Sequence, residues 1–174
     1  MMRNIGAVRN TLIAGFILVV CELLLPVSAD SNVDLHWLWD DRCASCHGHS
    51  GEFARQFLTV ADNKLQGRHH VDDLHRFLGN HYLSGQLVDD IYAMLLAQRQ
   101  HSARFKAECS RCHQVASSLV RDKLIFQDGV LSVKKTGASV NRFLQNHRRL
   151  QADDVIFYTE LLGRISREVN LPAR

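Results

Sequence analysis

Two short stretches, Cys43-Ala-Ser-Cys46-His47 and Cys109-Ser-Arg-Cys112-His113, decide how this chain of 174 residues is organised. Both have the pattern Cys-x-x-Cys-His, the attachment signature of a c-type haem. Two thiols three positions apart can form thioethers to the two vinyl groups of one porphyrin, and the adjacent histidine can bind the iron. The sequence therefore predicts two covalently bound haem c groups. Their attachment points are Cys43, Cys46, Cys109 and Cys112, and their proximal iron ligands are His47 and His113.

The cysteine pairs also allow two other interpretations. A chain exported from the cytoplasm could use them for two local disulfides or for a zinc site. The histidine that follows immediately in both copies favours haem over either alternative.

The segment 1–29 has the features of a secretory signal peptide. Arg3 and Arg9 are positive, the stretch 11–25 is largely apolar although Glu22 interrupts it, and small residues lead up to Ala29. The apolar stretch is short for a membrane span. Cleavage after Ala29 is expected, with an uncleaved membrane anchor as the alternative. Because haem c is attached outside the bacterial cytoplasmic membrane, we expect a periplasmic protein with no membrane span after cleavage.

The second half of the chain repeats the first at a constant offset, which takes Cys43 to Cys109. Both motifs follow this offset, and the segment Arg76-Phe77-Leu78-Gly79-Asn80-His81 returns as Arg142-Phe143-Leu144-Gln145-Asn146-His147. The leucine pair at 95–96 also returns, at 161–162. The repeat predicts duplication of one haem domain. The expected organisation is a signal peptide at 1–29, domain 1 at 30–100 and domain 2 at 101–174.

Apolar spacing predicts three helices in each half. Ser84 is the expected N-cap of the third helix of the first half. The glycine-containing stretches between the first and second helices are expected to be loops over the haem. The short connection after the first half predicts two domains packed at a defined angle. The helices are expected at 33–46, 72–81, 85–99, 104–112, 139–147 and 153–169, and the loops at 48–71 and 114–137.

Each iron has a second axial position, for which His81 and His147 are the candidates. Each follows its proximal histidine at the same spacing, and no other histidines outside the motifs match across the repeat. Each also ends an apolar helical stripe, with Leu74, Phe77 and His81 spaced for one helix face in the first half. Met94 is the only methionine beyond the signal peptide, so methionine cannot serve two equivalent sites. The sequence predicts two bis-histidine haems.

Two alternatives concern the first haem alone. His69 or His70 could bind its iron, although neither has a histidine counterpart in the second half. Met94 could do so as well, but its helical spacing favours core packing.

Charge is distributed unevenly between the halves. Residues 30–100 carry 6 basic and 10 acidic side chains, whereas residues 101–174 carry 13 basic and 7 acidic ones. Such a dipolar molecule could orient toward a charged redox partner, although both surfaces could also simply be solvated. Nucleic acid is not an expected partner, because the basic residues are scattered rather than interleaved with aromatic ones.

With these motifs, the chain resembles dihaem c-type cytochromes built from two class I-like cytochrome c domains. The likeness covers most of residues 33–165 and rests on the two Cys-x-x-Cys-His motifs and a closing amphipathic helix in each half. The architecture is similar to that of c4-type cytochromes, except that a Phe-Leu-x-Asn-His segment replaces the Met-bearing loop. The resemblance implies an all-α fold of two tandem cytochrome c-like domains, each wrapped around a covalent haem.

The expected function is that of an electron carrier rather than an enzyme. It would pass single electrons between a membrane quinol-oxidising or terminal complex and a soluble acceptor. Bis-histidine ligation predicts a reduction potential below that of a His/Met cytochrome. One alternative is a haem enzyme or gas sensor, peroxidase-like or NO/CO-binding, in which one distal histidine dissociates. Another is a non-catalytic subunit of a larger redox complex.

Overall fold

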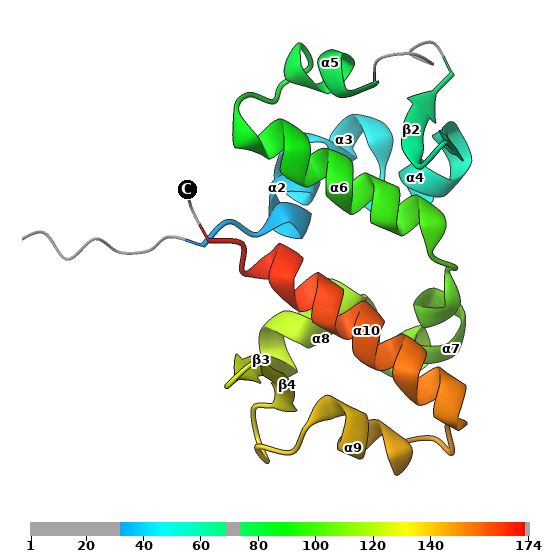
Figure 1. Ribbon diagram of the computed structural model, residues 1–174, viewed down its shortest axis with the longest axis vertical. Helices are drawn as coiled ribbons and strands as arrows, with labels where there is room; N and C mark the ends of the chain where they lie inside the picture. Colours follow the sequence, from blue (N-terminus) through cyan, green and yellow to red (C-terminus); the bar gives the residue numbers. More distant parts are fainter. Residues whose placement is uncertain (1–31, 69–73, 173–174) are drawn as a thin grey trace, which may run out of the picture. The chain divides into compact units, whose positions relative to one another are not determined.

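The computed structural model describes residues 32–68 and 74–172 (Figure 1). In these ranges the chain is mostly helical, with nine helices and two two-stranded β-hairpins. Among the described helices, none combines the length and the apolarity that crossing a bilayer requires. The predicted signal peptide, and the alternative ligands His69 and His70, lie outside the described residues.

The sequence repeat is also a structural repeat. Helix α4, strands β1 and β2 and helix α5 return as α8, β3, β4 and α9, with both bounds of every element displaced by the offset of the sequence repeat. The first half contains α2 (Leu35–Arg42), α3 (Ala44–His47), α4 (Ser50–Phe57), β1 (Leu58–Ala61), β2 (Lys64–Gly67), α5 (Leu74–Gly79) and α6 (Gln86–Gln100). The second half contains α7 (Arg104–His113), α8 (Ala116–Lys123), β3 (Leu124–Gln127), β4 (Val130–Val133), α9 (Val140–Gln145) and α10 (Ala152–Val169).

The two stretches expected to be loops, 48–71 and 114–137, instead contain a helix followed by an antiparallel hairpin. Each hairpin turns through two residues with positive φ, Asp62 (49°) and Asn63 (57°) in the first, Asp128 (50°) and Gly129 (78°) in the second. Such turns match the twist of the flanking strands, and Asp, Asn and Gly tolerate the left-handed backbone best. The expectation of loops was wrong because only the two turn residues of each stretch indicate a hairpin in the sequence.

The helix expected at 33–46 is divided at Cys43 into α2 and α3. Asp34 caps α2, since its carboxylate accepts a hydrogen bond from the Trp37 N–H at 2.9 Å. The prediction of Ser84 as the N-cap of α6 was wrong, because that position is taken by Gly85, with φ 57° and no side-chain hydrogen bond. In the second half Ser139 does cap α9.

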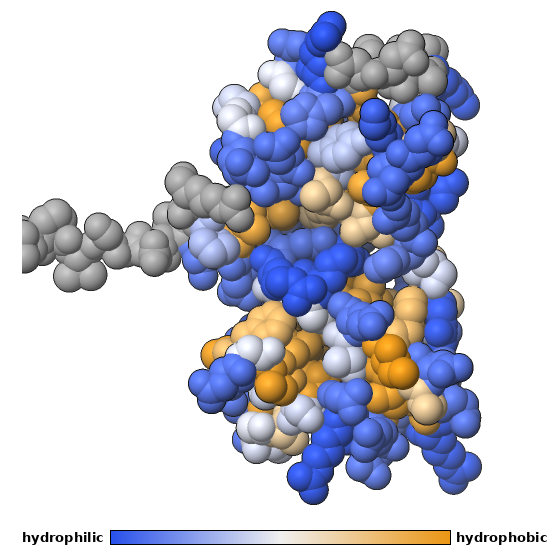
Figure 2. Space-filling model, viewed as in Figure 1, coloured by the Kyte–Doolittle hydropathy of each residue, from blue (hydrophilic) through white to orange (hydrophobic). Residues whose placement is uncertain are grey.

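Each half has its own hydrophobic cluster. Trp39 and its counterpart Phe105 are both buried, from α2 and α7 respectively. Met94 is only 1% exposed and lies within the first cluster, as core packing requires. In the second half, the hairpin β3–β4 also leaves apolar side chains exposed on the surface, which Figure 2 shows gathered over these strands.

The buried positions of the closing helix α6 recur in α10 at an offset that is one residue larger than the offset of the other repeated elements. Val155 lies ten residues beyond the end of α9, whereas Val88 lies nine beyond the end of α5. The buried pair Leu161–Leu162 of α10 therefore takes the place of Met94–Leu95 in α6, and not that of 95–96. The connection before α10 is one residue longer than the one before α6, and it shifts the buried positions by one residue. The sequence match of the two leucine pairs was therefore wrong.

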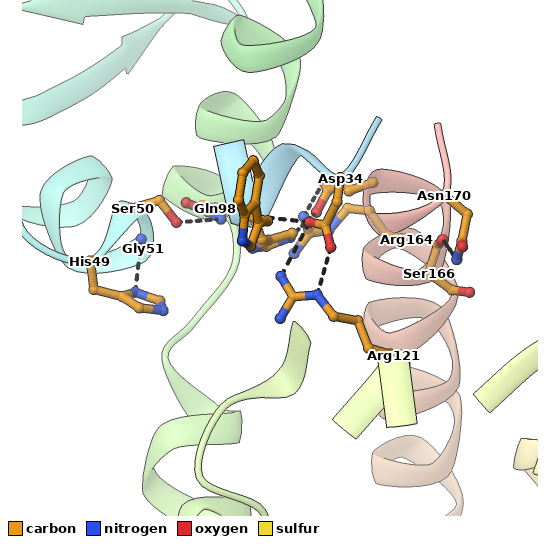
Figure 3. Close-up of polar contacts among 12 residues, drawn as sticks. Asp34, His49, Ser50, Gly51, Gln98, Arg121, Arg164, Ser166 and Asn170 are labelled. Carbon is orange, nitrogen blue, oxygen red and sulfur yellow. Dashed lines mark hydrogen bonds and ion pairs between the residues drawn. The ribbon is translucent and has the colours of Figure 1, made fainter. Parts of the chain in front are cut away.

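Residues 31–174 form one compact unit, in which several contacts join the halves. Helix α10 packs on α8 and α9 and also contacts α2 (Figure 1). Val33 and Leu171 form an antiparallel bridge, with N···O distances of 2.7 and 3.0 Å. The Arg121 guanidinium donates to the Asp34 carboxylate at 2.5 Å, as Figure 3 shows. These contacts join the two halves directly.

Replacing Asp34 with alanine removes both the cap of α2 and the ion pair with Arg121. The expected loss is about 1–2 kcal/mol of unfolding free energy at pH 7, measured by chemical denaturation. Burial raises the pKa of Asp34, but hydrogen bonds from Arg121 and the Trp37 N–H outweigh it, so the pKa lies below its ordinary value. The stabilisation is therefore complete above about pH 4 and is lost as the pH falls through the lower folded pKa. Asp41→Ala, at an exposed position of the same helix, is the matched control; an equal loss there would contradict the assignment.

Candidate functional site

In each half the structure brings together the motif histidine and the distal histidine predicted for it. The ring centroids of His47 and His81 are 5.9 Å apart, with 66° between the ring planes. Those of His113 and His147 are 6.0 Å apart, with 47° between the planes. All four side chains are half-buried. The two sequence-predicted pairs are therefore assembled in the same way, twice.

Helix geometry explains how each pair forms. His47 is the last residue of α3 and His113 the last residue of α7, so each motif delivers its imidazole from a helix end. His81 and His147 follow α5 and α9 by two residues, where backbone N–H groups still bond to carbonyls of the preceding turn. The short helices α5 and α9 thus position the second imidazole.

The separation within each pair suits two ligands of one metal ion. An imidazole nitrogen binds a metal at about 2.0 Å, and two imidazoles on opposite sides of one ion have ring centres about 6 Å apart. The values of 5.9 and 6.0 Å agree with this arrangement.

The electrostatics favour a neutral imidazole at one histidine of each pair, His47 in the first and His147 in the second. Burial lowers the pKa of His47, and the neighbouring His81 lowers it further. Burial likewise lowers the pKa of His147, followed by the effects of His113 and Arg148. A neutral imidazole is the form that binds a metal.

A phenylalanine stacks on the second histidine of each pair, which the sequence pattern indicated only as part of an apolar stripe. The rings of Phe77 and His81 are 4.8 Å apart at 22°, and those of Phe143 and His147 are 5.0 Å apart at 27°. Both phenylalanines lie four residues before their histidine, so the repeated spacing was the available signal. In each half the second imidazole therefore lies against an aromatic ring as well as against its partner histidine.

The cysteines are also arranged alike in both halves. Cys43 and Cys109 are half-buried against their hydrophobic clusters, whereas Cys46 and Cys112 are exposed, and all four are free thiols. Burial raises the pKa of the Cys43 and Cys109 thiols. Within residues 32–68 and 74–172, no three His, Cys, Asp or Glu side chains converge as a metal site of their own. Two thiols and two imidazoles per half fit a haem c.

The surroundings of the two sites differ. At the first, the Trp39 indole donates to the Gly48 carbonyl at 2.9 Å, and Phe53 lies edge-on to His47 with 4.7 Å between centroids. At the second, Glu108 accepts hydrogen bonds from Arg104 and from the Tyr158 hydroxyl, and Tyr158 also lies beside Cys109. The first site is thus mainly aromatic, and the second borders a charged network that the repeat did not predict.

Comparison of this chain with protein-family models, with curated proteins and with solved structures finds no match.

Proposed function

We propose that this chain is a dihaem c-type cytochrome that carries single electrons between redox partners in the periplasm. The observation that carries the proposal is the repeated histidine pair, with ring centroids 5.9 Å apart in one half and 6.0 Å in the other. A haem, when bound, supplies reversible one-electron chemistry at its iron.

The residues of each half have separate tasks in this proposal. Cys43 and Cys46, and likewise Cys109 and Cys112, hold the porphyrin covalently. His47 and His81 would hold the iron of the first half, and His113 and His147 that of the second. Two histidines in each half would hold one iron and leave no position for a substrate, so a bound haem would supply one-electron exchange rather than substrate binding.

The arrangement of the halves supports transfer through two sites in sequence. We assign each half to a cytochrome c-like domain, and the Val33–Leu171 bridge and the Asp34–Arg121 ion pair keep the two sites at a fixed separation. The acidic first half and the basic second half offer different docking faces. The proposed partners are a membrane quinol-oxidising or terminal complex and a soluble redox protein.

Low-temperature electron paramagnetic resonance of the oxidised, full-length protein tests the proposal. We expect two low-spin signals of the bis-histidine type, and haem that stays with the polypeptide under denaturing conditions. A substantial high-spin signal would show an open iron and would replace the carrier by a ligand-binding or peroxidatic protein. Protein without covalent haem would refute both.

A further inference from the structure

We propose that the cavity between the two halves binds a small organic carboxylate. This cavity has a volume of about 290 Å³ and is lined by residues of both halves. None of the four cysteines of the motifs, and none of the four paired histidines, lines it. Its volume is near the lower end of that of ligand sites in proteins, about 300 Å³. The cavity is formed by protein groups alone and does not depend on haem.

The amino-terminal end of α8 opens into the cavity without a cap. Helix ends of this kind leave the first N–H groups unpaired and carry a partial positive charge. In the first half His49 caps α4, since its Nδ1 accepts a hydrogen bond from the Gly51 N–H at 3.3 Å (Figure 3). Val115 occupies the same place in the repeat and has no polar atom to offer. The unpaired N–H groups in the first turn of α8 are therefore available to an anion.

Two polar side chains that line the cavity, the buried Gln98 and the half-buried Arg164, each have a buried atom without a partner. Gln98 is only 7% exposed; its Nε2 bonds to the Ser50 hydroxyl at 3.1 Å (Figure 3), and its Oε1 is unpaired. Because the amide can be turned, the same contact allows Gln98 to accept from Ser50 and to offer its NH₂ group to a ligand. The Nε of Arg164 is likewise buried and unpaired, although Nη1 of this side chain bonds to Glu168.

Charge in the cavity favours an anion. Its cations are Arg55, Lys106 and Arg164. Lys106 is bonded to Glu52, the one carboxylate of the lining, and Arg164 is bonded to Glu168, so the unpaired positive charge is that of Arg55. Arg55 has no ion-pair partner within the described residues. The three histidines that also line the cavity, His36, His49 and His101, add donors, and His36 is bonded to the buried Glu168 at 2.9 Å.

The remaining wall is apolar, which sets the class of anion. Phe105, Leu161 and Ile165 line the cavity together with Val115. A bare inorganic ion would leave these side chains against empty space or water. A planar or branched acid of a few carbons would place its body on them and its carboxylate at α8 and Arg164.

Calorimetric titration of the purified, full-length protein with benzoate at pH 7 tests the proposal. We expect saturable binding of one benzoate per chain. The neutral isostere benzamide, and inorganic phosphate, should each bind at least about tenfold more weakly, because one lacks the charge and the other the apolar body. Absence of saturable binding, or equal affinity for benzamide, would overturn the proposal. The visible spectrum of the same sample reports separately on haem.

Two variants locate the bound benzoate. Arg164→Gln should weaken binding about tenfold or more, whereas Arg167→Gln, an exposed position of the same helix, should leave it unchanged. Because Arg164 also bonds to Glu168, Val115→Asp serves as a second test. An aspartate at this position would cap α8 with its own carboxylate, so benzoate affinity should fall while thermal stability is kept or raised. Unchanged affinity in Val115→Asp would refute the site.

Discussion

Replacing His81 with alanine is expected to convert one of the two low-spin haem signals into a high-spin signal and to leave the other unchanged. The reason is local, because His81 lies against His47 in the first half, and the second pair is formed by other helices. His147→Ala should affect the other haem in the same way. In each variant, the reduced protein should bind one equivalent of carbon monoxide, which the parent protein should not bind tightly. Electron paramagnetic resonance and carbon monoxide titration measure both effects.

His75→Ala is the matched control for His81→Ala. His75 lies on α5, the helix that His81 follows by two residues, but it is exposed and bonds to Asp89 at 2.6 Å instead of facing an imidazole. Its replacement should leave both low-spin signals intact. An unchanged spectrum in His81→Ala would move the ligand to another residue, with His69 and His70 as the candidates to substitute next.

The phenylalanine that stacks on each distal histidine gives a smaller and graded effect. Phe143→Leu should keep His147 as a ligand but loosen its orientation, because the ring contact at 5.0 Å is lost. We expect a broader low-spin signal from the second haem and faster carbon monoxide binding at that site alone. Stopped-flow mixing of the reduced protein measures the rate, and a rate equal to that of the parent would show that the stacking does not position the imidazole.

The candidate site could be predicted from the sequence because its residues are fixed by short motifs and by an exact repeat. The spacing between His47 and His81 recurs unchanged between His113 and His147, and both pairs meet in the structure. A duplicated chain repeats its tertiary contacts, so residues that recur in register are strong candidates for a shared site. The stacking phenylalanines recur as well, but periodicity alone assigned them to a core.

Other features escaped prediction because they depend on contacts distant in sequence or on single residues. His36 bonds to Glu168, which lies 132 residues away in the sequence, and Asp34 bonds to Arg121, which lies 87 residues away. No local sequence pattern predicts these contacts between the halves. The hairpins were not predicted because the glycines and polar residues of the stretches 48–71 and 114–137 indicated loops. The uncapped end of α8 results from one difference between the halves, Val115 in place of His49. Such differences are where a duplicated domain gains a property that its twin lacks.

The haem-free chain is expected to lack a cooperative thermal transition, whereas the haem-loaded protein should melt sharply. Each half has about 70 residues, and domains of this size bury little apolar surface by themselves and are only marginally stable. Two aromatic side chains remain open to solvent although they contact the distal histidines: Tyr82, beside His81, is 82% exposed, and Phe143, beside His147, is 43% exposed. A large apolar cofactor between the imidazoles would supply the missing contacts.

The comparison requires the same chain produced with and without the haem-attachment machinery, followed by near-ultraviolet circular dichroism and melting. The haem-free chain should keep much of its helical signal but lose its aromatic signal and bind a hydrophobic dye. The double variant Cys43→Ser and Cys46→Ser refines the test, since it should load only the second half. Its second hydrophobic cluster, around Tyr158, should still melt cooperatively, while the first, around Trp39 and Ile91, should not. A sharp transition in the haem-free chain would instead mean that these two clusters are sufficient without cofactor, and the haems would then be guests of a preformed fold rather than part of its core.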